Sequence, residues 1–164
     1  MEQNESTVQS QYQMQSEFLA DPVKHVYGVQ GSGVDYHLQG LIRMVNESTT
    51  GLSFGITLFT ASGTITGTLI SRKIYFEKFG QSFQSGFEKA FPDTDWAHIA
   101  QSYADMGTEG DDLREEGSYI SPPQFIHLDD AKLLGENGAL LIKSGMLWRG
   151  KVKSVDGFLL GVIS

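Results

Sequence analysis

Alternation of apolar and small polar residues over residues 52–69 constrains the fold of this chain more than any other feature. In "GLSFGITLFTASGTITGTLIS" one alternating set is mainly apolar, and the other is mostly serine, threonine and glycine. A period of two is typical of strands with one buried face. The two runs flank a short Ala-Ser-Gly turn and therefore predict an antiparallel β-hairpin. Glycines inside both runs favour strong bending.

An amphipathic helix is predicted ahead of the hairpin, from about residue 34 to 46. Apolar residues recur there at spacings of three and four, which places them in one stripe on the helix. Ser32 and Asp35 have the spacing of a capping box before that stripe. We expect the stripe to cover the core, with His37 and Arg43 on the solvent side.

A second amphipathic helix is predicted from about residue 73 to 90, ending near Pro92. Phenylalanines at positions 76, 79, 83 and 87 lie on one side of it. We interpret this row as a core or helix-packing surface rather than a ligand pocket, because covering a sheet requires such a stripe. Asp93 is expected to cap a further short helix that carries Trp96 and stops near Gly107.

The region after this helix reads as a loop followed by strands. Residues 109–116 are rich in acidic side chains and predict a solvated loop. A strand is predicted at about 125–128, and "ENG" at 136–138 predicts a turn before a further strand in "ALLIK".

The closing segment, "LWRGKVKSVDGFLLGVIS", joins a cationic run to an apolar one. Asp156-Gly157 is the sequence of a two-residue type I′ turn, so we predict a terminal hairpin. In that register the face with Trp148, Leu159 and Ile163 is expected to be hidden. The other face is expected to bind an acidic partner surface, with a merely solvated face as the alternative. Its residues are Arg149, Lys151, Lys153, Phe158, Leu160 and Val162.

Together these elements predict an α+β, mainly β fold. The expected form is a small bent SH3-like or Sm-like barrel or half-barrel with an N-terminal amphipathic helix and inserted helices. Residues 1–31 are expected to be a low-complexity Gln/Ser-rich tail, with an interaction tail or an added edge strand as alternatives. Residues 32–164 are expected to form a single β-rich domain with a helical and acidic-loop insertion at about 73–121.

Composition narrows the class of function. A net charge of −8 and a pI near 4.8 oppose nonspecific attraction to nucleic acid or anionic lipid. The absence of cysteine excludes disulfides and thiolate metal sites. We expect a cytoplasmic protein, because no secretory signal and no membrane-spanning stretch is present in the sequence.

No strong catalytic motif is present: the sequence contains no G-x-S-x-G, H-E-x-x-H or P-loop. Asp93, Asp95 and His98 are more simply explained by capping and a surface pair than by metal binding. His127 and Asp129 share a strand face, and we interpret them as a surface pair rather than an acid–base couple. We therefore expect no catalytic, cofactor-binding or metal site.

Three ordered blocks from about residue 35 onward resemble the gas vesicle accessory protein U (GvpU) family. They are the hairpin segment quoted above leading into "YFEKF", then "FIHLDDAKLL", and the closing segment. The resemblance implies a cytoplasmic, noncatalytic auxiliary of gas vesicles, which are protein-shelled gas compartments that give buoyancy. It also implies association with the gas vesicle shell or other gas vesicle proteins, and it carries no catalytic residue over.

Three functional hypotheses follow. The first is an interaction protein that forms a homo-oligomer and makes weak multivalent contacts in vesicle assembly or clustering. The alternative is an Sm-like module that binds single-stranded RNA; the cationic run favours it and the net charge opposes it. The third is a small hydrolase, which is supported only by scattered His and Asp residues.

Overall fold

The computed structural model describes residues 20, 34–108, 122–135, 139–142 and 144–163. The predicted N-terminal tail, the acidic loop at 109–116 and the turn at 136–138 lie outside these ranges. The strands are β1 (Phe54–Thr60), β2 (Gly63–Leu69), β3 (Phe125–Leu134), β4 (Met146–Lys151) and β5 (Val155–Leu160). The helices are α3 (Tyr36–Asn46), α4 (Arg72–Phe87) and α5 (Trp96–Thr108), and a short 3₁₀ turn, η1 (Val152–Ser154), joins β4 to β5.

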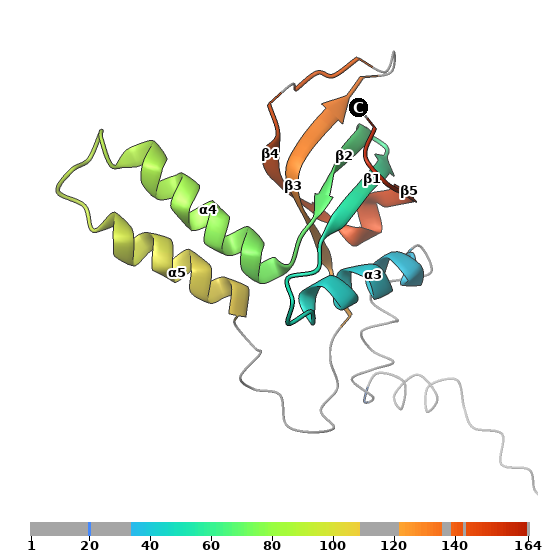
Figure 1. Cartoon of the computed structure of the whole chain (residues 1–164), viewed down its shortest axis with the longest axis horizontal. Helices are drawn as coiled ribbons and strands as arrows, with labels where there is room; N and C mark the ends of the chain where they lie inside the picture. Colours follow the sequence, from blue (N-terminus) through green and yellow to red (C-terminus); the bar gives the residue numbers. More distant parts are fainter. Residues whose placement is uncertain (1–19, 21–33, 109–121, 136–138, 143, 164) are drawn as a thin grey trace, which may run out of the picture.

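The strands form one antiparallel sheet in the order β4-β3-β2-β1-β5 (Figure 1). This confirms the α+β class, but the mainly β part of the prediction is not confirmed, because the described helices hold at least as many residues as the strands. The closed-barrel form of the prediction is wrong, because closure requires β4 to pair with β5. Instead β4 pairs with β3 and β5 pairs with β1, which leaves β4 and β5 as the two edges of the sheet.

The predicted hairpin at 52–69 is confirmed as β1 and β2. Thr57 lies opposite Thr66 and Leu58 opposite Ile65, so the apolar set of both strands shares one face. The chain reverses between Thr60 and Gly63. The period-two pattern fixes this register, because a slip by one residue would turn every apolar side chain to the other face.

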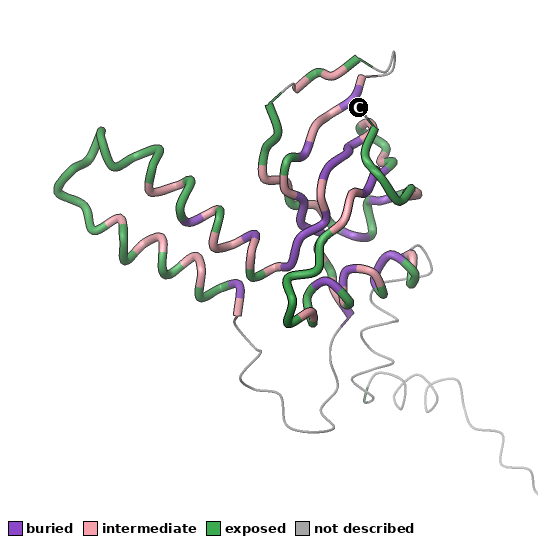
Figure 2. The backbone as a smooth tube through the Cα atoms, in the orientation of Figure 1, coloured by how far each residue is buried: buried purple, intermediate pink, exposed green. Residues whose placement is uncertain are grey.

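Helix α3 covers the apolar face of the sheet (Figures 1 and 2). Asp35 caps its first turn, since its carboxylate accepts hydrogen bonds from the backbone N–H groups of His37 and Leu38. The predicted apolar stripe is buried, and each such large side chain contributes about 1.5–3 kcal/mol. Arg43 is half-buried rather than on the solvent side. Fully buried side chains of this core include Leu38, Ile42, Val45, Ile56, Leu58, Leu69, Ile126 and Leu128.

Helices α4 and α5 form an antiparallel hairpin that projects away from the sheet (Figure 1). The phenylalanine row of α4 packs chiefly within this hairpin, for example Phe79 against Tyr103 with ring centres 5.0 Å apart. The helix-packing interpretation is therefore confirmed. Asp95 rather than Asp93 caps α5, because its carboxylate accepts from the N–H of His98 at 3.0 Å.

The predicted terminal hairpin is wrong. Asp156 and Gly157 lie inside β5, and the chain turns earlier, in η1. The reason is burial: Val152 and Val155 flank this turn and both are in the core, which outweighs the local preference of Asp-Gly for a tight turn. Trp148 packs against the core, as expected.

The strand predicted in "ALLIK" is reduced to one isolated bridge. Leu140 pairs with Leu134 outside the named strands, and the chain then enters β4. The partner of β3 on this side is therefore β4, with His127 opposite Arg149 and Leu128 opposite Trp148.

Candidate functional site

The six residues predicted to bind a partner do not share one face. Because β4 and β5 lie at opposite edges of the sheet, Arg149 and Lys151 are on a different strand edge from the apolar residues, and Lys153 lies on η1 between the two strands. The cations Arg149, Lys151 and Lys153 are exposed on β4 and η1, whereas Phe158 is half-buried on β5 and Leu160 and Val162 are exposed beside it. Whether these residues bind a partner stays a prediction.

The cationic group is anchored by an aromatic ring on the neighbouring strand. The guanidinium carbon of Arg149 lies 3.5 Å from the centre of the Phe125 ring. A cation–π contact at an exposed site is worth about 0.5–1 kcal/mol. With exposed Lys151 and Lys153 nearby in sequence, this edge presents positive charge in a chain of net charge −8.

Large apolar side chains are exposed on β5 and just after it. Leu159, Leu160, Val162 and Ile163, which we call the C-terminal apolar surface, are 55%, 68%, 56% and 42% exposed. No charged residue interrupts them. Apolar side chains gathered in this way mark interaction surfaces. Leu159 and Ile163 were expected on the hidden face, so the sequence prediction missed them.

Two buried threonines hold the C-terminal apolar surface on the sheet. Gly161, with φ +112°, turns the chain so that residues 161–163 pass beside β1 and β2. Thr57 donates its single hydroxyl proton to the carbonyl of Gly161 at 2.9 Å. Thr66 must therefore donate to Thr57, also at 2.9 Å, and it accepts from the N–H of Ile163 at 3.0 Å. Every hydroxyl in this network is satisfied.

His127 lies buried where α4 meets the sheet. Its ring centre is 4.7 Å from that of Tyr75, and neither ring nitrogen has a hydrogen-bond partner within the described part of the chain. Burial, and then the positive charges of Arg149 and Arg72, lower the pKa of His127 from its usual 6.5 to about 4. The ring is therefore neutral at pH 7. The predicted surface pair of His127 and Asp129 is wrong, because His127 is buried and Asp129 pairs with Lys78.

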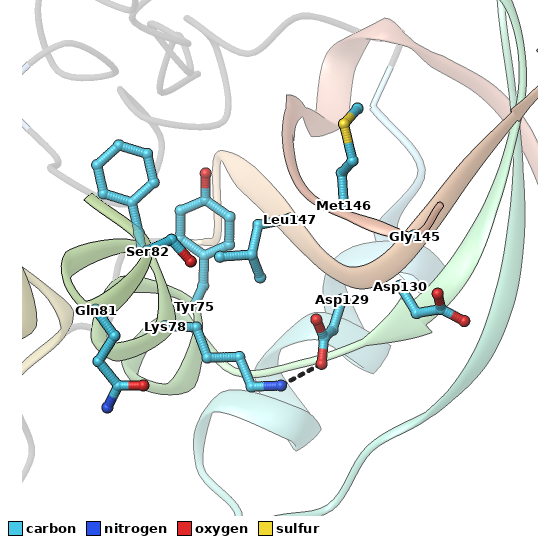
Figure 3. Close-up of a pocket in the computed structure, with 10 residues that line it drawn as sticks. Tyr75, Lys78, Gln81, Ser82, Asp129, Asp130, Gly145, Met146 and Leu147 are labelled. Carbon is cyan, nitrogen blue, oxygen red and sulfur yellow. Dashed lines mark hydrogen bonds and ion pairs between the residues drawn. The ribbon is translucent and has the colours of Figure 1, made fainter. Parts of the chain in front are cut away.

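An open hollow of about 670 Å³ lies between α4 and the β3–β4 edge (Figure 3). Its lining includes Tyr75, Met146 and Leu147 beside the ion pair of Lys78 and Asp129. In the ranges that the structure describes, no three His, Cys, Asp or Glu residues gather where they could hold a metal ion. The described lining of the hollow therefore contains an ion pair but no recognisable arrangement of catalytic residues.

The residues considered for a metal site do not form one. Asp95 is occupied in capping α5, and Asp93 and His98 are exposed on and before the same helix. Two carboxylates and one imidazole on an open surface lack the convergent ligands that a structural metal site needs.

The far end of the α4–α5 hairpin carries a cluster of four aromatic side chains. This hairpin tip consists of Phe83, Phe87, Phe91 and Trp96. Phe87 stacks on Trp96 with ring centres 5.7 Å apart, and the indole N–H of Trp96 donates to the carbonyl of Phe91 at 2.8 Å. Phe87 and Phe91 nevertheless stay 42% and 56% exposed. Rigid exposed aromatics are typical of interface anchors.

The helices that the structure describes include none with the length and apolar character required to span a membrane.

Comparison with known proteins gives one clear result. The family model described as gas vesicle protein GvpU-like matches residues 35–163, which contain every described helix and strand from α3 to β5. A search of curated proteins found no match, and neither did a search of solved structures. The match begins at Asp35, the cap of α3, and ends at Ile163, the residue bound to Thr66. The chain belongs to the GvpU-like family of gas vesicle proteins.

Proposed function

We propose that this chain is a noncatalytic accessory protein that acts in gas vesicle assembly or clustering through protein–protein contacts, including contacts between its own copies. Family membership supplies the gas vesicle context. The observation that carries the interaction role is the C-terminal apolar surface, because natural sheets rarely leave large apolar side chains on an open edge unless another chain covers them.

Clustering requires each protein unit to make at least two contacts. The hairpin tip supplies a second apolar surface, at the far end of α4 and α5 from the sheet (Figures 1 and 2). Weak contacts at two separate places multiply in avidity when the particles are large and carry many binding sites. This geometry suits a protein that gathers vesicles in the cytoplasm.

The cationic edge suits a third kind of contact, with an acidic surface. Arg149, Lys151 and Lys153 are all exposed, in a chain whose net charge is −8. Another copy, the vesicle shell or another gas vesicle protein is the proposed partner. Such contacts add steering and specificity more than raw affinity, and they weaken as salt is added.

The test is light scattering of purified gas vesicles titrated with the purified full chain at physiological salt. We expect the scattering to rise with protein concentration as clusters form. An unrelated protein of similar size and net charge is the control. No binding and no clustering at any ratio of protein to vesicle would contradict the proposal.

The exposed cations also favour a second candidate, a module that binds single-stranded RNA. The net charge of −8 opposes it, and Phe125, the aromatic ring beside the cations, is already covered by Arg149. Filter binding with labelled single-stranded RNA over a salt series separates the two candidates. No affinity at low salt eliminates RNA binding, since electrostatic contacts are strongest there.

A further inference from the structure

The outer side of β5 carries backbone groups that face away from the sheet. Gly161 donates its N–H to the carbonyl of Gly55 at 2.8 Å, so Gly161 and, two residues earlier, Leu159 direct their backbone groups toward β1. The backbone N–H and C=O groups of Phe158 and Leu160 therefore point outward. Among the described residues, β5 pairs with β1 alone.

The two edges of the sheet differ in how they are protected. On β4, Arg149 and Lys151 are exposed, and charged side chains on an edge strand oppose pairing with a like strand. On β5 the exposed Asp156 stands near the start of the strand; no charge follows from Phe158 to Ile163, and Leu159 and Leu160 are mostly exposed. The edge of β5 is thus the one on which another strand can add at least cost.

We propose that two copies of this chain join edge to edge through β5, about a two-fold axis near Leu159. A two-fold axis places identical strands antiparallel, which is the pairing that every neighbouring strand in this sheet already has. The outward backbone groups of Phe158 in each copy then bond with those of Leu160 in the other. The two sheets become one continuous sheet, and the contact closes at a dimer.

The side chains of β5 fit this register. Leu159 meets its own copy on one face, and Leu160 meets the partly buried Phe158 of the other copy on the opposite face, so both faces gain an apolar cross-strand pair. Asp156 lies three residues before Leu159 on β5, so the two Asp156 residues stand at opposite ends of the paired segment. The two Asp156 carboxylates are then separated by six residues of strand, about 20 Å, which exceeds the screening length.

This dimer rests on the proposed self-association and gives it a definite form. Each copy contributes one α4–α5 hairpin with its exposed tip, so the dimer presents two tips and can bridge two particles. A small interface of this kind binds weakly, and its effect on vesicles depends on valency.

The test compares two leucines of nearly equal exposure. Leu160 is 68% exposed on β5, and Leu141 is 64% exposed outside the strands, so Leu160→Lys and Leu141→Lys change charge and apolar area alike. Sedimentation equilibrium of the full chain should give a dimer for the wild type and for Leu141→Lys. Leu160→Lys should raise the dimer dissociation constant by about tenfold or more.

A second variant tests the backbone hydrogen bonds of the proposed β5 pairing separately from side-chain charge. Leu160→Pro removes the outward N–H of residue 160 without touching an N–H directed at β1, and edge strands tolerate proline at such positions. Hydrogen exchange offers a readout without mutation: the amides of Phe158 and Leu160 should gain protection as wild-type concentration rises.

The outcomes separate this inference from the proposed function. A wild type that stays monomeric at all concentrations removes self-association itself. If the wild type associates and the Leu160→Lys variant associates equally well, the β5 interface is contradicted, while self-association itself remains. Association that grows beyond two copies and is lost in Leu160→Lys overturns the two-fold arrangement, since pairing of β5 with β4 would give open chains or rings.

Discussion

The hydroxyl group of Thr66 donates to that of Thr57 across 2.9 Å between neighbouring strands, and through this pair the sheet holds residues 161–163. The pair is fully buried although both residues come from the polar set of the hairpin pattern. The sequence pattern predicts that this face of the sheet is exposed to solvent, but the last described residues of the chain cover it.

We expect Thr57→Val to lower the free energy of unfolding by about 1–3 kcal/mol, because it removes the donor to Gly161 and the acceptor for Thr66. Thr66→Val should cost a similar amount. The double substitution should cost less than the sum of the two, since no hydroxyl is then left unpaired between them. Urea unfolding measures all three, with Thr68→Val on the same strand as the control. Additive costs would contradict the relay of hydrogen bonds.

His127 should make the protein less stable in acid. Its pKa is about 4 in the folded chain and 6.5 when exposed, so the unfolded state binds a proton first as the pH falls. The free energy of unfolding is therefore unaffected by His127 above pH 6.5. It falls as the pH drops from 6.5 to about 4, by up to about 3 kcal/mol in total. His127→Phe should flatten this part of the stability curve, while His98→Asn on the exposed side of α5 should not. An unchanged slope in His127→Phe would assign the acid sensitivity to other groups.

Gly80 should be essential to the contact between α4 and α5. A Cβ atom there would lie 2.5 Å from the carbonyl oxygen of Ala100, so Gly80→Ala must push the two helices apart. We expect a loss of about 1–3 kcal/mol and a weaker aromatic signal in near-UV circular dichroism. Gly86→Ala in the same helix is the matched control, because nothing lies within 4 Å of its added Cβ. That control should gain at most about 0.5–1 kcal/mol from helix propensity, because Gly86 lies in the last turn of α4. Equal effects at both positions would argue against a tight helix contact.

Charge reversal on the cationic edge should weaken association with acidic partners. Lys151→Glu with Lys153→Glu should reduce vesicle clustering most at low salt, where screening is least, and should leave unfolding midpoints nearly unchanged because both side chains are exposed. Lys89→Glu, exposed beyond α4, is the single-charge control. Clustering by the double variant that matches the wild type at every salt concentration would remove this edge from the proposed contacts.

The elements that could be predicted from the sequence are those in which local pattern and burial agree. In β1 and β2 the alternation of apolar side chains decides both the type of element and its register, and Leu58 opposite Ile65 follows from it. In α3 the apolar stripe and the cap at Asp35 point to the same helix.

The terminal hairpin failed because local and long-range preferences conflict there. Asp156-Gly157 favours a tight turn, but burying Val152 and Val155 in the core places the turn earlier, in η1, and Asp156 and Gly157 become part of β5. Pairing of β5 with β1 joins residues about a hundred positions apart, and no local signal specifies it. The predicted partner-binding surface was therefore also wrong in part, because Leu159 is exposed and not hidden.

The length of α4 sets a spacing for whatever the protein binds. Its sixteen residues extend about 24 Å at 1.5 Å per residue, and the exposed Phe87 stands at the end remote from the sheet. A body docked at that end is held clear of β5, so neither occupant obstructs the other. In the proposed function the two-helix arm would act as a spacer, and shortening it by whole turns would bring the two bound bodies closer together.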